Sequence, residues 1–393
     1  MTETKPLRVL LVSSSSGSEG GGELYLVGLA EGLRALGHEV EALVSTHPRM
    51  DKLAQLLQPW ANVQREPYTN TYDRRLRTIG AVLDRPLIRR LRDRLRAAAP
   101  DVIHINKQNV EDGLDLVLAA ANSGLPFVST IHITRDPASL RARGGSIRGW
   151  IAQSVLRRTA SPCLTIARVC GEELAAQLGQ TVGTSRIHCV LNGVREAPTA
   201  DREAIRREWG CKGSDFVLGC LARIERQKNP LFLVSLLPDL PEHVRLVWVG
   251  DGRLRDELLS IAQRLGVRHR VHVDGWRSDA RARLAGFDLF ALPSQYEGFP
   301  FAVLEAMAAS LPCVVSDVDG TREAIVDCQS GYLCPPNDRN AWLSCLRMLI
   351  DDECRRKTVG LSARRRYSKC FSLAAMAGGT LDVYRKVIAA SRT

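Results

Sequence analysis

Residues 7–44 read LRVLLVSSSSGSEGGGELYLVGLAEGLRALGHEVEALV, and this stretch decides the fold. An apolar run at residues 7–13 leads into a Gly/Ser stretch, then into apolar residues at helical spacing over residues 23–37, then into a second apolar run at residues 40–44. Short apolar runs bounded by turn residues are typical of buried strands, and apolar residues three and four positions apart are typical of a helix. Gly37 fits the stop of that helix. The stretch therefore predicts a strand, a helix and a second strand.

The same alternation continues along the chain and then starts again after a polar linker at residues 196–201. Because strands that alternate with helices form parallel sheets covered on both faces, we expect two doubly wound α/β domains, residues 1–195 and residues 196–372, followed by a last helix. The further strands are expected at residues 101–105, 127–131, 163–166, 216–221, 245–249, 270–273, 289–292 and 313–316, and the later helices include residues 254–265, 301–309 and 373–390.

The composition is that of a soluble globular protein. At roughly 100–200 residues per domain, 393 residues make about two domains. A spanning helix needs roughly 18 or more consecutive apolar residues, and the chain has no such run. The 11 cysteines are odd in number and lack the paired spacing of a disulfide framework or a zinc site, so we expect no metal site and a reducing, cytoplasmic location.

The formal charge of +11 is unevenly distributed. Residues 74–96, the basic segment, hold nine arginines and two aspartates, with Leu87, Ile88, Leu91 and Leu95 at helical spacing among them. This pattern indicates a basic amphipathic helix, which could lie on an anionic membrane or hold an anionic ligand. A solvated helix face explains it equally well. Nucleic acid is not expected as a partner, because no base-stacking aromatic residues are interleaved.

Two features of the N-terminal half could bind a ligand. Gly20, Gly21 and Gly22 precede the first helix, where free N–H groups make an anion site, although their spacing is not that of a dinucleotide fingerprint. A flexible surface loop is the alternative. His132 follows the strand at residues 127–131, at the edge where such sheets bind ligands, although a lone histidine is often merely packed. His104 has a similar position and a weaker claim.

Two basic residues follow the first strand of the second half. Arg223 and Lys228 are five positions apart and could reach one anionic group, since arginine suits bidentate phosphate contact. A surface basic pair is the alternative. The Gly250-Asp251-Gly252 sequence after the next strand predicts a tight turn.

Residues 295–317 read QYEGFPFAVLEAMAASLPCVVSD and place Glu297 and Glu305 eight positions apart. Pro300 fits the first turn of a helix, so Glu297 lies in the preceding loop and Glu305 lies inside the helix. A helix start that attracts phosphate, flanked by carboxylates that accept hydrogen bonds from hydroxyls, suggests a nucleotide sugar. A favourable helix-dipole interaction alone would explain Glu297, but it explains Glu305 poorly.

Together these motifs resemble the retaining GT-B glycosyltransferases of family 4, from residue 7 to about residue 385. The resemblance implies two Rossmann-like domains that face a central cleft. Residues 1–195 would bind the acceptor, residues 196–372 would bind the nucleotide sugar, and a C-terminal helix at about residues 373–393 would pack back on the first domain. The chain departs from the family at Ala222, Asn229 and Pro300, where glycine is common.

The resemblance also implies the roles of single residues. Arg223 and Lys228 would hold the diphosphate, Glu305 the ribose, and Glu297 the transferred sugar, which His132 would also contact. The residues implied in catalysis are Glu297, His132, Arg223 and Lys228. The implied donor-binding residues are Gly21, Gly22, Arg223, Lys228, Gly250, Trp276, Arg277, Glu297, Gly298, Phe299, Pro300, Phe301, Ala302, Val303 and Glu305. Neither a metal nor another cofactor is implied, because the basic residues and helix dipoles would neutralise the leaving diphosphate.

The implied activity is transfer of a sugar from a nucleotide-diphosphate sugar to an acceptor hydroxyl, with retention at the anomeric carbon. The implied pathways are the synthesis of cell-surface polysaccharide, lipopolysaccharide or glycolipid, with a glycan or lipid-linked acceptor. The basic segment adds an expectation of peripheral binding to the inner face of the membrane. The alternatives are a nucleotide-sugar 2-epimerase, a sugar phosphorylase, and an inactive subunit that binds nucleotide sugars.

Overall fold

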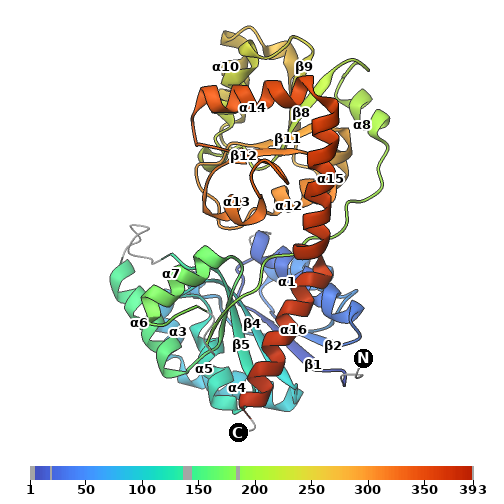
Figure 1. Ribbon diagram of the computed structural model, residues 1–393. Helices are drawn as coiled ribbons and strands as arrows, with labels where there is room; N and C mark the ends of the chain where they lie inside the picture. Colours follow the sequence, from blue (N-terminus) through green and yellow to red (C-terminus); the bar gives the residue numbers. More distant parts are fainter. Residues whose placement is uncertain (1–4, 18–19, 136–143, 183–185, 392–393) are drawn as a thin grey trace. The chain divides into compact units, whose positions relative to one another are not determined.

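The computed structural model describes residues 5–17, 20–135, 144–182 and 186–391, and the chain separates into two compact units (Figure 1). The first unit comprises Met1–Gly193 together with Leu373–Thr393, and the second comprises Val194–Ser372. The glycine-rich loop predicted before the first helix includes residues 18–19, which lie outside the described residues.

The first unit is built on a seven-stranded parallel sheet with the order β3-β2-β1-β4-β5-β6-β7 among its described residues. The strand order reverses at β1, which lies between β2 and β4, so this is the switch point beside which such sheets bind ligands. The strands are β1 (Arg8–Ser13), β2 (Glu39–Ser45), β3 (Asn62–Glu66), β4 (Val102–Asn109), β5 (Phe127–Ile133), β6 (Cys163–Thr165) and β7 (Ile187–Cys189).

Two helices from opposite ends of the chain pack closely in the first unit. A Cβ on Gly32 of α1 (Gly21–Ala35) would lie 2.8 Å from the Cβ of Ala377 in α16 (Leu373–Ala390), so the glycine permits the close approach. The other helices of this unit are α2 (Asp51–Leu57), α3 (Arg77–Leu83), α4 (Arg85–Ala98), α5 (Leu114–Ser123), α6 (Gly145–Arg158) and α7 (Arg168–Leu178), with short 3₁₀ turns at Pro48–Met50 and Thr71–Asp73.

The basic segment forms two helices, α3 and α4, so the prediction of a single helix is wrong in extent, although α4 by itself is the predicted basic amphipathic helix. The side chain of Asp84 accepts a hydrogen bond from the backbone N–H of Leu87 and caps α4, and Pro86 lies in the first turn of α4. An N-cap followed by proline begins a new helix. The apolar residues of α4 are buried in the core of the unit, so they offer no apolar face to a membrane: Leu87, Ile88, Leu91 and Leu95.

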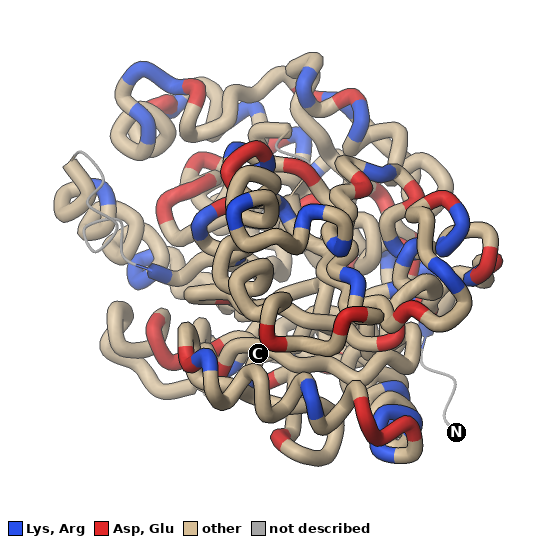
Figure 2. The backbone as a smooth tube through the Cα atoms, turned by 90° about the horizontal axis from the view of Figure 1, so that it is seen from above, with Lys and Arg blue, Asp and Glu red and all other residues tan. Residues whose placement is uncertain are grey.

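Several arginines of the basic segment are used within the unit itself. The guanidinium of Arg74 lies 3.0 Å from the Asp84 carboxylate and 2.8 Å from that of Asp115. Arg90 pairs with Glu66 at 3.2 Å, and Arg96 donates to a backbone carbonyl. Basic and acidic positions are interspersed along the chain trace (Figure 2). These arginines of the basic segment therefore make contacts within the unit and are not all available to an outside partner.

The second unit is built on a six-stranded parallel sheet with the order β10-β9-β8-β11-β12-β13. The strand order reverses at β8, which lies between β9 and β11. The strands are β8 (Phe216–Leu221), β9 (Val244–Val249), β10 (Val271–Gly275), β11 (Leu289–Leu292), β12 (Cys313–Ser316) and β13 (Tyr332–Cys334).

The helices of the second unit are α8 (Arg202–Glu208), α9 (Pro230–Leu236), α10 (Arg255–Arg264), α11 (Ala280–Arg283), α12 (Phe301–Ala308), α13 (Asp319–Ala324), α14 (Arg339–Asp351) and α15 (Glu353–Cys370). Short 3₁₀ turns lie at Arg226–Lys228, Leu237–Asp239, Arg268–Arg270 and Leu284–Gly286. Two parallel sheets with helices between their strands confirm the predicted α/β class. No helix in the described ranges combines the length and the apolar character needed to cross a membrane. All eleven cysteines are free thiols.

Candidate functional site

Two loops meet at the carboxyl edge of the second unit's sheet. β8 and β11 are parallel neighbours, so the loop carrying Arg223 and Lys228 and the loop carrying Glu297 leave the sheet at the same edge. Backbone contacts tie the loops together: the N–H of Gln295 donates to the Gln227 carbonyl at 2.8 Å, and the Gln227 amide donates to the Tyr296 carbonyl at 3.0 Å.

A buried ion pair lies at this junction. The Nζ of Lys228 lies 2.5 Å from the Oε1 of Glu297, and the two side chains are 15% and 5% exposed. The hydroxyl of Ser294, which follows β11, donates to the same Oε1 at 2.6 Å. Two donors therefore fix the Glu297 carboxylate through one oxygen, while its Oε2 accepts no hydrogen bond from the described residues.

Arg223 is exposed, and its side chain makes no ion pair or hydrogen bond with any part of the chain that the structure describes. The backbone on either side of it is held by the turn after β9. A Cβ on Gly250 would lie 2.0 Å from the Ala222 carbonyl oxygen, and one on Gly252 would lie 2.4 Å from that of Ile224. Only glycine permits the backbone of the turn to come this close to the Arg223 loop. The turn therefore supports the backbone on both sides of Arg223, whose guanidinium is unpaired among the described residues.

α12 begins directly after the Glu297 loop. Its N-cap is Pro300, so the proline stands one position before the helix instead of in its first turn. Gly298 is exposed, and a Cβ there would meet nothing within 4 Å. Gly320 packs against the carbonyl side of the same loop, and its N–H donates to the Glu297 carbonyl at 3.3 Å. The N-terminal N–H groups of α12, which include those of Phe301 and Ala302, lie next to this open backbone.

Glu305 lies within α12, and its carboxylate is 15% exposed. Burial raises its pKa to about 7, and the guanidinium of Arg281, 3.5 Å away, partly opposes that rise. Arg281 is itself held by the Arg195 carbonyl, to which it donates at 2.9 Å. The Glu305 carboxyl group therefore takes up a proton more readily than an exposed glutamate does.

Trp276 and Arg277 follow β10 at the same edge of the sheet, separated from β8 by β9. Trp276 is 68% exposed. Arg277 lies on the surface and pairs with Asp279 at 3.0 Å. Phe299 and Val303 are buried, so their side chains support the loop and the helix.

Sequence reasoning missed two members of this cluster, Ser294 and Arg281. Ser294 stands two residues after the end of β11, and its place near the carboxyl end of a strand was the available signal. Arg281 approaches Glu305 from α11, and nothing in its local sequence indicates that contact.

The first unit has a polar network at the carboxyl edge of its own sheet. His132 at the end of β5 is 7% exposed, and its Nε2 lies 2.8 Å from the Oδ1 of Asn106 on β4. The Nδ2 of Asn106 donates to the carbonyl of Gly22, in the first turn of α1, at 2.9 Å. Gly22 is thereby linked to His132 within one unit. Sequence reasoning missed Asn106.

His104 belongs to the packing of the first unit. It is fully buried, its Nδ1 lies 2.6 Å from the hydroxyl of Tyr384 in α16, and its Nε2 lies 2.9 Å from the hydroxyl of Thr130. Burial lowers the pKa of both His104 and His132 to about 3, so both rings are neutral at physiological pH.

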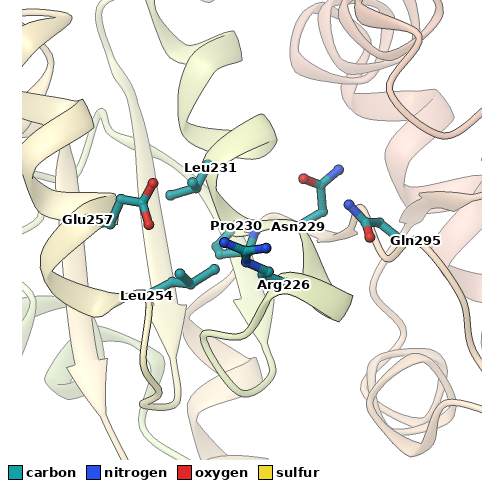
Figure 3. A pocket seen from close by; sticks show the side chains of 7 residues that line it. All are labelled: Arg226, Asn229, Pro230, Leu231, Leu254, Glu257 and Gln295. Atoms are coloured by element: carbon teal, nitrogen blue, oxygen red, sulfur yellow. The ribbon is translucent and has the colours of Figure 1, made fainter. Parts of the chain in front are cut away.

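A cavity of about 340 Å³ lies beside the Arg226–Lys228 turn (Figure 3). The side chains that line it come from the loops after β8, β9 and β11 and from the first turns of α9 and α10: Arg226, Asn229, Pro230, Leu231, Leu254, Glu257 and Gln295. It is therefore next to the Lys228–Glu297 pair and not centred on it. Among the described residues, no group of three or more His, Cys, Asp or Glu side chains could hold a metal ion.

Comparison with known proteins gives a consistent picture. The model of the Glycosyltransferase Family 4 matches residues 19–197, and that of the Glycosyl transferases group 1 matches residues 201–366. A GDP-mannose-dependent alpha-mannosyltransferase of Mycobacterium tuberculosis is 30% identical over 319 residues, with 79% of each chain covered. The Escherichia coli UDP-Gal:alpha-D-GlcNAc-diphosphoundecaprenol alpha-1,3-galactosyltransferase is 28% identical over 320 residues, 75% of this chain and 80% of that one.

Among solved structures, Anabaena HepE in complex with UDP superposes with a TM-score of 0.77 at 22% identity, covering 96% of this chain and 99% of that one. At this level of identity the likeness concerns the fold, and together with the two parallel sheets it confirms the predicted GT-B fold.

Proposed function

Because the chain belongs to the glycosyl transferases group 1 and is a glycosyltransferase, we propose that it moves a sugar from a nucleoside-diphosphate sugar to an acceptor hydroxyl with retention. The observation that carries the proposal is the Lys228–Glu297 pair at the carboxyl edge of the second sheet, beside the unpaired Arg223. In this proposal the second unit binds the donor and the first unit binds the acceptor.

The diphosphate lies between basic side chains and the start of α12. Arg223 offers a planar fork of donors to phosphate oxygens. Lys228 has three N–H donors and uses one for Glu297, so two remain for an anion. The N-terminal N–H groups of α12 add a favourable dipole. Together these groups stabilise the negative charge that develops on the leaving diphosphate, so the reaction needs no metal.

The two carboxylates bind hydroxyls in different places. Glu297 is fixed through Oε1, so its Oε2 accepts a hydrogen bond from a hydroxyl of the transferred sugar. Glu305 accepts hydrogen bonds from the ribose hydroxyls, and Arg281 stabilises its ionised form when those donors arrive. The nucleobase of the donor lies near Arg277 and the exposed Trp276.

Retention follows a same-face route without a covalent enzyme intermediate. The bond between the anomeric carbon and the phosphate oxygen breaks, and the acceptor oxygen forms its bond to the same face of that carbon. The acceptor proton passes to an oxygen of the departing diphosphate. Glu297 orients the transferred sugar for this reaction, and His132 is the candidate of the first unit for a contact to a sugar hydroxyl.

The acceptor is a glycan or a lipid-linked saccharide on a route to cell-surface polysaccharide, lipopolysaccharide or glycolipid. The name of the Escherichia coli relative, which includes an acceptor linked to diphosphoundecaprenol, supports this choice. A location in the cytoplasm, on the inner face of the membrane, fits such an acceptor.

We also propose that the first unit touches an anionic membrane through α3 and α6 rather than through α4. Leu83 of α3 and Trp150 of α6 are 65% and 67% exposed, and the two helices pack against each other. Exposed arginines such as Arg75 and Arg158 lie on the same segments. Tryptophan favours the membrane interface and arginine favours anionic head groups.

Vesicle co-sedimentation tests the membrane proposal. We expect wild-type protein to bind phosphatidylglycerol vesicles more than phosphatidylcholine vesicles, and binding to weaken as salt rises. Trp150→Ser should reduce binding, whereas Leu361→Ser, a matched change at an exposed residue of the second unit, should not. Equal binding by both variants, or salt-insensitive binding, contradicts the proposal.

A donor screen tests the enzymatic proposal. UDP- and GDP-linked sugars are incubated with and without a polyprenyl-diphosphate saccharide, and products are separated by mass spectrometry. Acceptor-dependent release of nucleoside diphosphate with a new glycoside supports transfer. Conversion of the donor sugar to its epimer without an acceptor would instead identify a nucleotide-sugar 2-epimerase, and donor binding without turnover an inactive subunit.

A further inference from the structure

Asn106 has a fixed orientation in the first unit. It is fully buried, and one end of its side-chain amide faces the Gly22 carbonyl at 2.9 Å. A backbone carbonyl only accepts hydrogen bonds, so the end that faces it must be the NH₂ group. The Oδ1 of Asn106 therefore points to His132.

That orientation decides which nitrogen of His132 carries its proton. The Oδ1 of Asn106 only accepts hydrogen bonds, and the Nε2 of His132 lies 2.8 Å from it, so Nε2 must donate. Burial lowers the pKa of His132 to about 3, so the ring is neutral and carries one N–H. Its Nδ1 is then a bare acceptor, an assignment that follows from the hydrogen-bond network.

The Nδ1 of His132 is left available. It makes no hydrogen bond with the described part of the chain, and it is not among the buried polar atoms of those residues that lack a partner, so it is not sealed from solvent. The ring cannot turn freely, because the ring of Tyr25 meets it edge to face with centroids 4.8 Å apart. A fixed ring thus presents one acceptor at the carboxyl edge of the sheet.

We propose that Asn106 is a positioning residue that holds His132 as the Nε2–H tautomer, so that Nδ1 accepts a hydrogen bond from a hydroxyl of the transferred sugar. The proposal rests on the proposed function, in which a sugar reaches His132. It adds the direction of that hydrogen bond: the sugar donates and the imidazole accepts. A chain of hydrogen bonds then runs from the sugar hydroxyl through His132 and Asn106 to the carbonyl of Gly22, at the start of α1.

The direction of the hydrogen bond sets a selectivity. A sugar with fluorine in place of the contacted hydroxyl cannot donate, so it loses the bond to Nδ1. An imidazole that presented Nδ1–H could still donate weakly to fluorine. We therefore expect wild-type kcat/KM to fall about tenfold for the fluorinated donor at one position of the ring, the size expected for one hydrogen bond.

The first test is spectroscopic and needs no substrate. Protein with ¹⁵N-labelled histidine is examined by long-range proton–nitrogen correlation, and the His132 signals are identified by their loss in His132→Gln. Wild type should show an unprotonated Nδ1 and a protonated Nε2. Asn106→Leu, which cannot accept, should show a mixture of tautomers. Thr130→Val is the matched control, because Thr130 is equally buried but bonds to His104 and Tyr25 instead.

The second test is kinetic and uses the series of deoxyfluoro derivatives of whichever UDP- or GDP-linked sugar the wild type consumes. Asn106→Leu should lower kcat/KM about tenfold for the natural donor and lose most of the discrimination against the fluorinated one. Thr130→Val should keep that discrimination even if it lowers thermal stability.

A protonated Nδ1 in wild type, or an unchanged tautomer in Asn106→Leu, overturns the proposal. An altered tautomer with unchanged fluorine discrimination overturns the contact to the sugar. If the wild type consumes no nucleotide sugar, the proposed function fails, and the His132 spectrum still decides the tautomer.

Discussion

Replacing Glu297 by glutamine separates the two tasks given to the Lys228–Glu297 pair. The change keeps the shape of the side chain and removes its negative charge. Glu297 places a negative charge beside the ammonium that also binds the incoming diphosphate, so we expect Glu297→Gln to bind UDP or GDP as well as wild type, or better, while losing transfer.

The structure sets the size of these effects. With the two side chains 15% and 5% exposed, the pair is mostly buried, and removing one partner of a fully buried pair costs about 3–5 kcal/mol. Glutamine keeps hydrogen bonds to Ser294 and Lys228 and leaves the lysine partly solvated, so the loss of stability should be about 1–2 kcal/mol. For a domain of this size that lowers the Tm by about 2–8 °C. Removing the negative charge from beside Lys228 should tighten nucleotide binding by about 1 kcal/mol, or about fivefold.

Isothermal titration with UDP and with GDP measures the affinity, and release of nucleoside diphosphate in the presence of acceptor measures transfer. Lys228→Met is the matched variant, because it removes the other half of the pair and should weaken nucleotide binding about tenfold or more. The expected gain in affinity is refuted if Glu297→Gln weakens nucleotide binding as much as Lys228→Met does.

Three further changes probe the surroundings. Burial raises the folded-state pKa of Glu305 from 4.5 to about 7, so wild type should lose up to about 3 kcal/mol of stability as the pH rises through this range. Glu305→Gln should therefore lack that loss when Tm is followed from pH 4.5 to 8. Gly252→Ala places a Cβ 2.4 Å from the Ile224 carbonyl and should destabilise the fold by about 1–3 kcal/mol in urea unfolding. Tyr384→Phe leaves the buried Nδ1 of His104 unpaired and should cost about 1–3 kcal/mol, measured the same way.

The central strands of both sheets could be predicted from the sequence, because they are buried on both faces and read as continuous apolar runs. β3, at the edge of the first sheet, was missed because its sequence NVQRE is polar and half exposed. β7 and β13 were missed because each has only three residues and lies at an edge of its sheet, whereas the equally short β6 lies between two strands. The two helices of the basic segment were merged because arginines and leucines continue across Asp84, where a side-chain cap begins α4.

Candidate residues could be picked from the sequence, but their contacts could not. Their spacing after a strand singled out Arg223 and Lys228, and their places around a helix start singled out Glu297 and Glu305. The ion pair between Lys228 and Glu297 joins residues 69 positions apart, and only the strand order brings β8 beside β11. The approach of Arg281 to Glu305 and that of Asn106 to His132 are likewise set by tertiary packing.

The most direct test of the account is the anomeric configuration of the product. Wild type is incubated with the nucleotide sugar that it consumes and a polyprenyl-diphosphate saccharide acceptor, and the new glycoside is examined by proton NMR. We predict an acceptor-dependent glycoside with the same anomeric configuration as the donor, and none with Glu297→Gln. An inverted glycoside, or undiminished transfer by Glu297→Gln, would contradict the account.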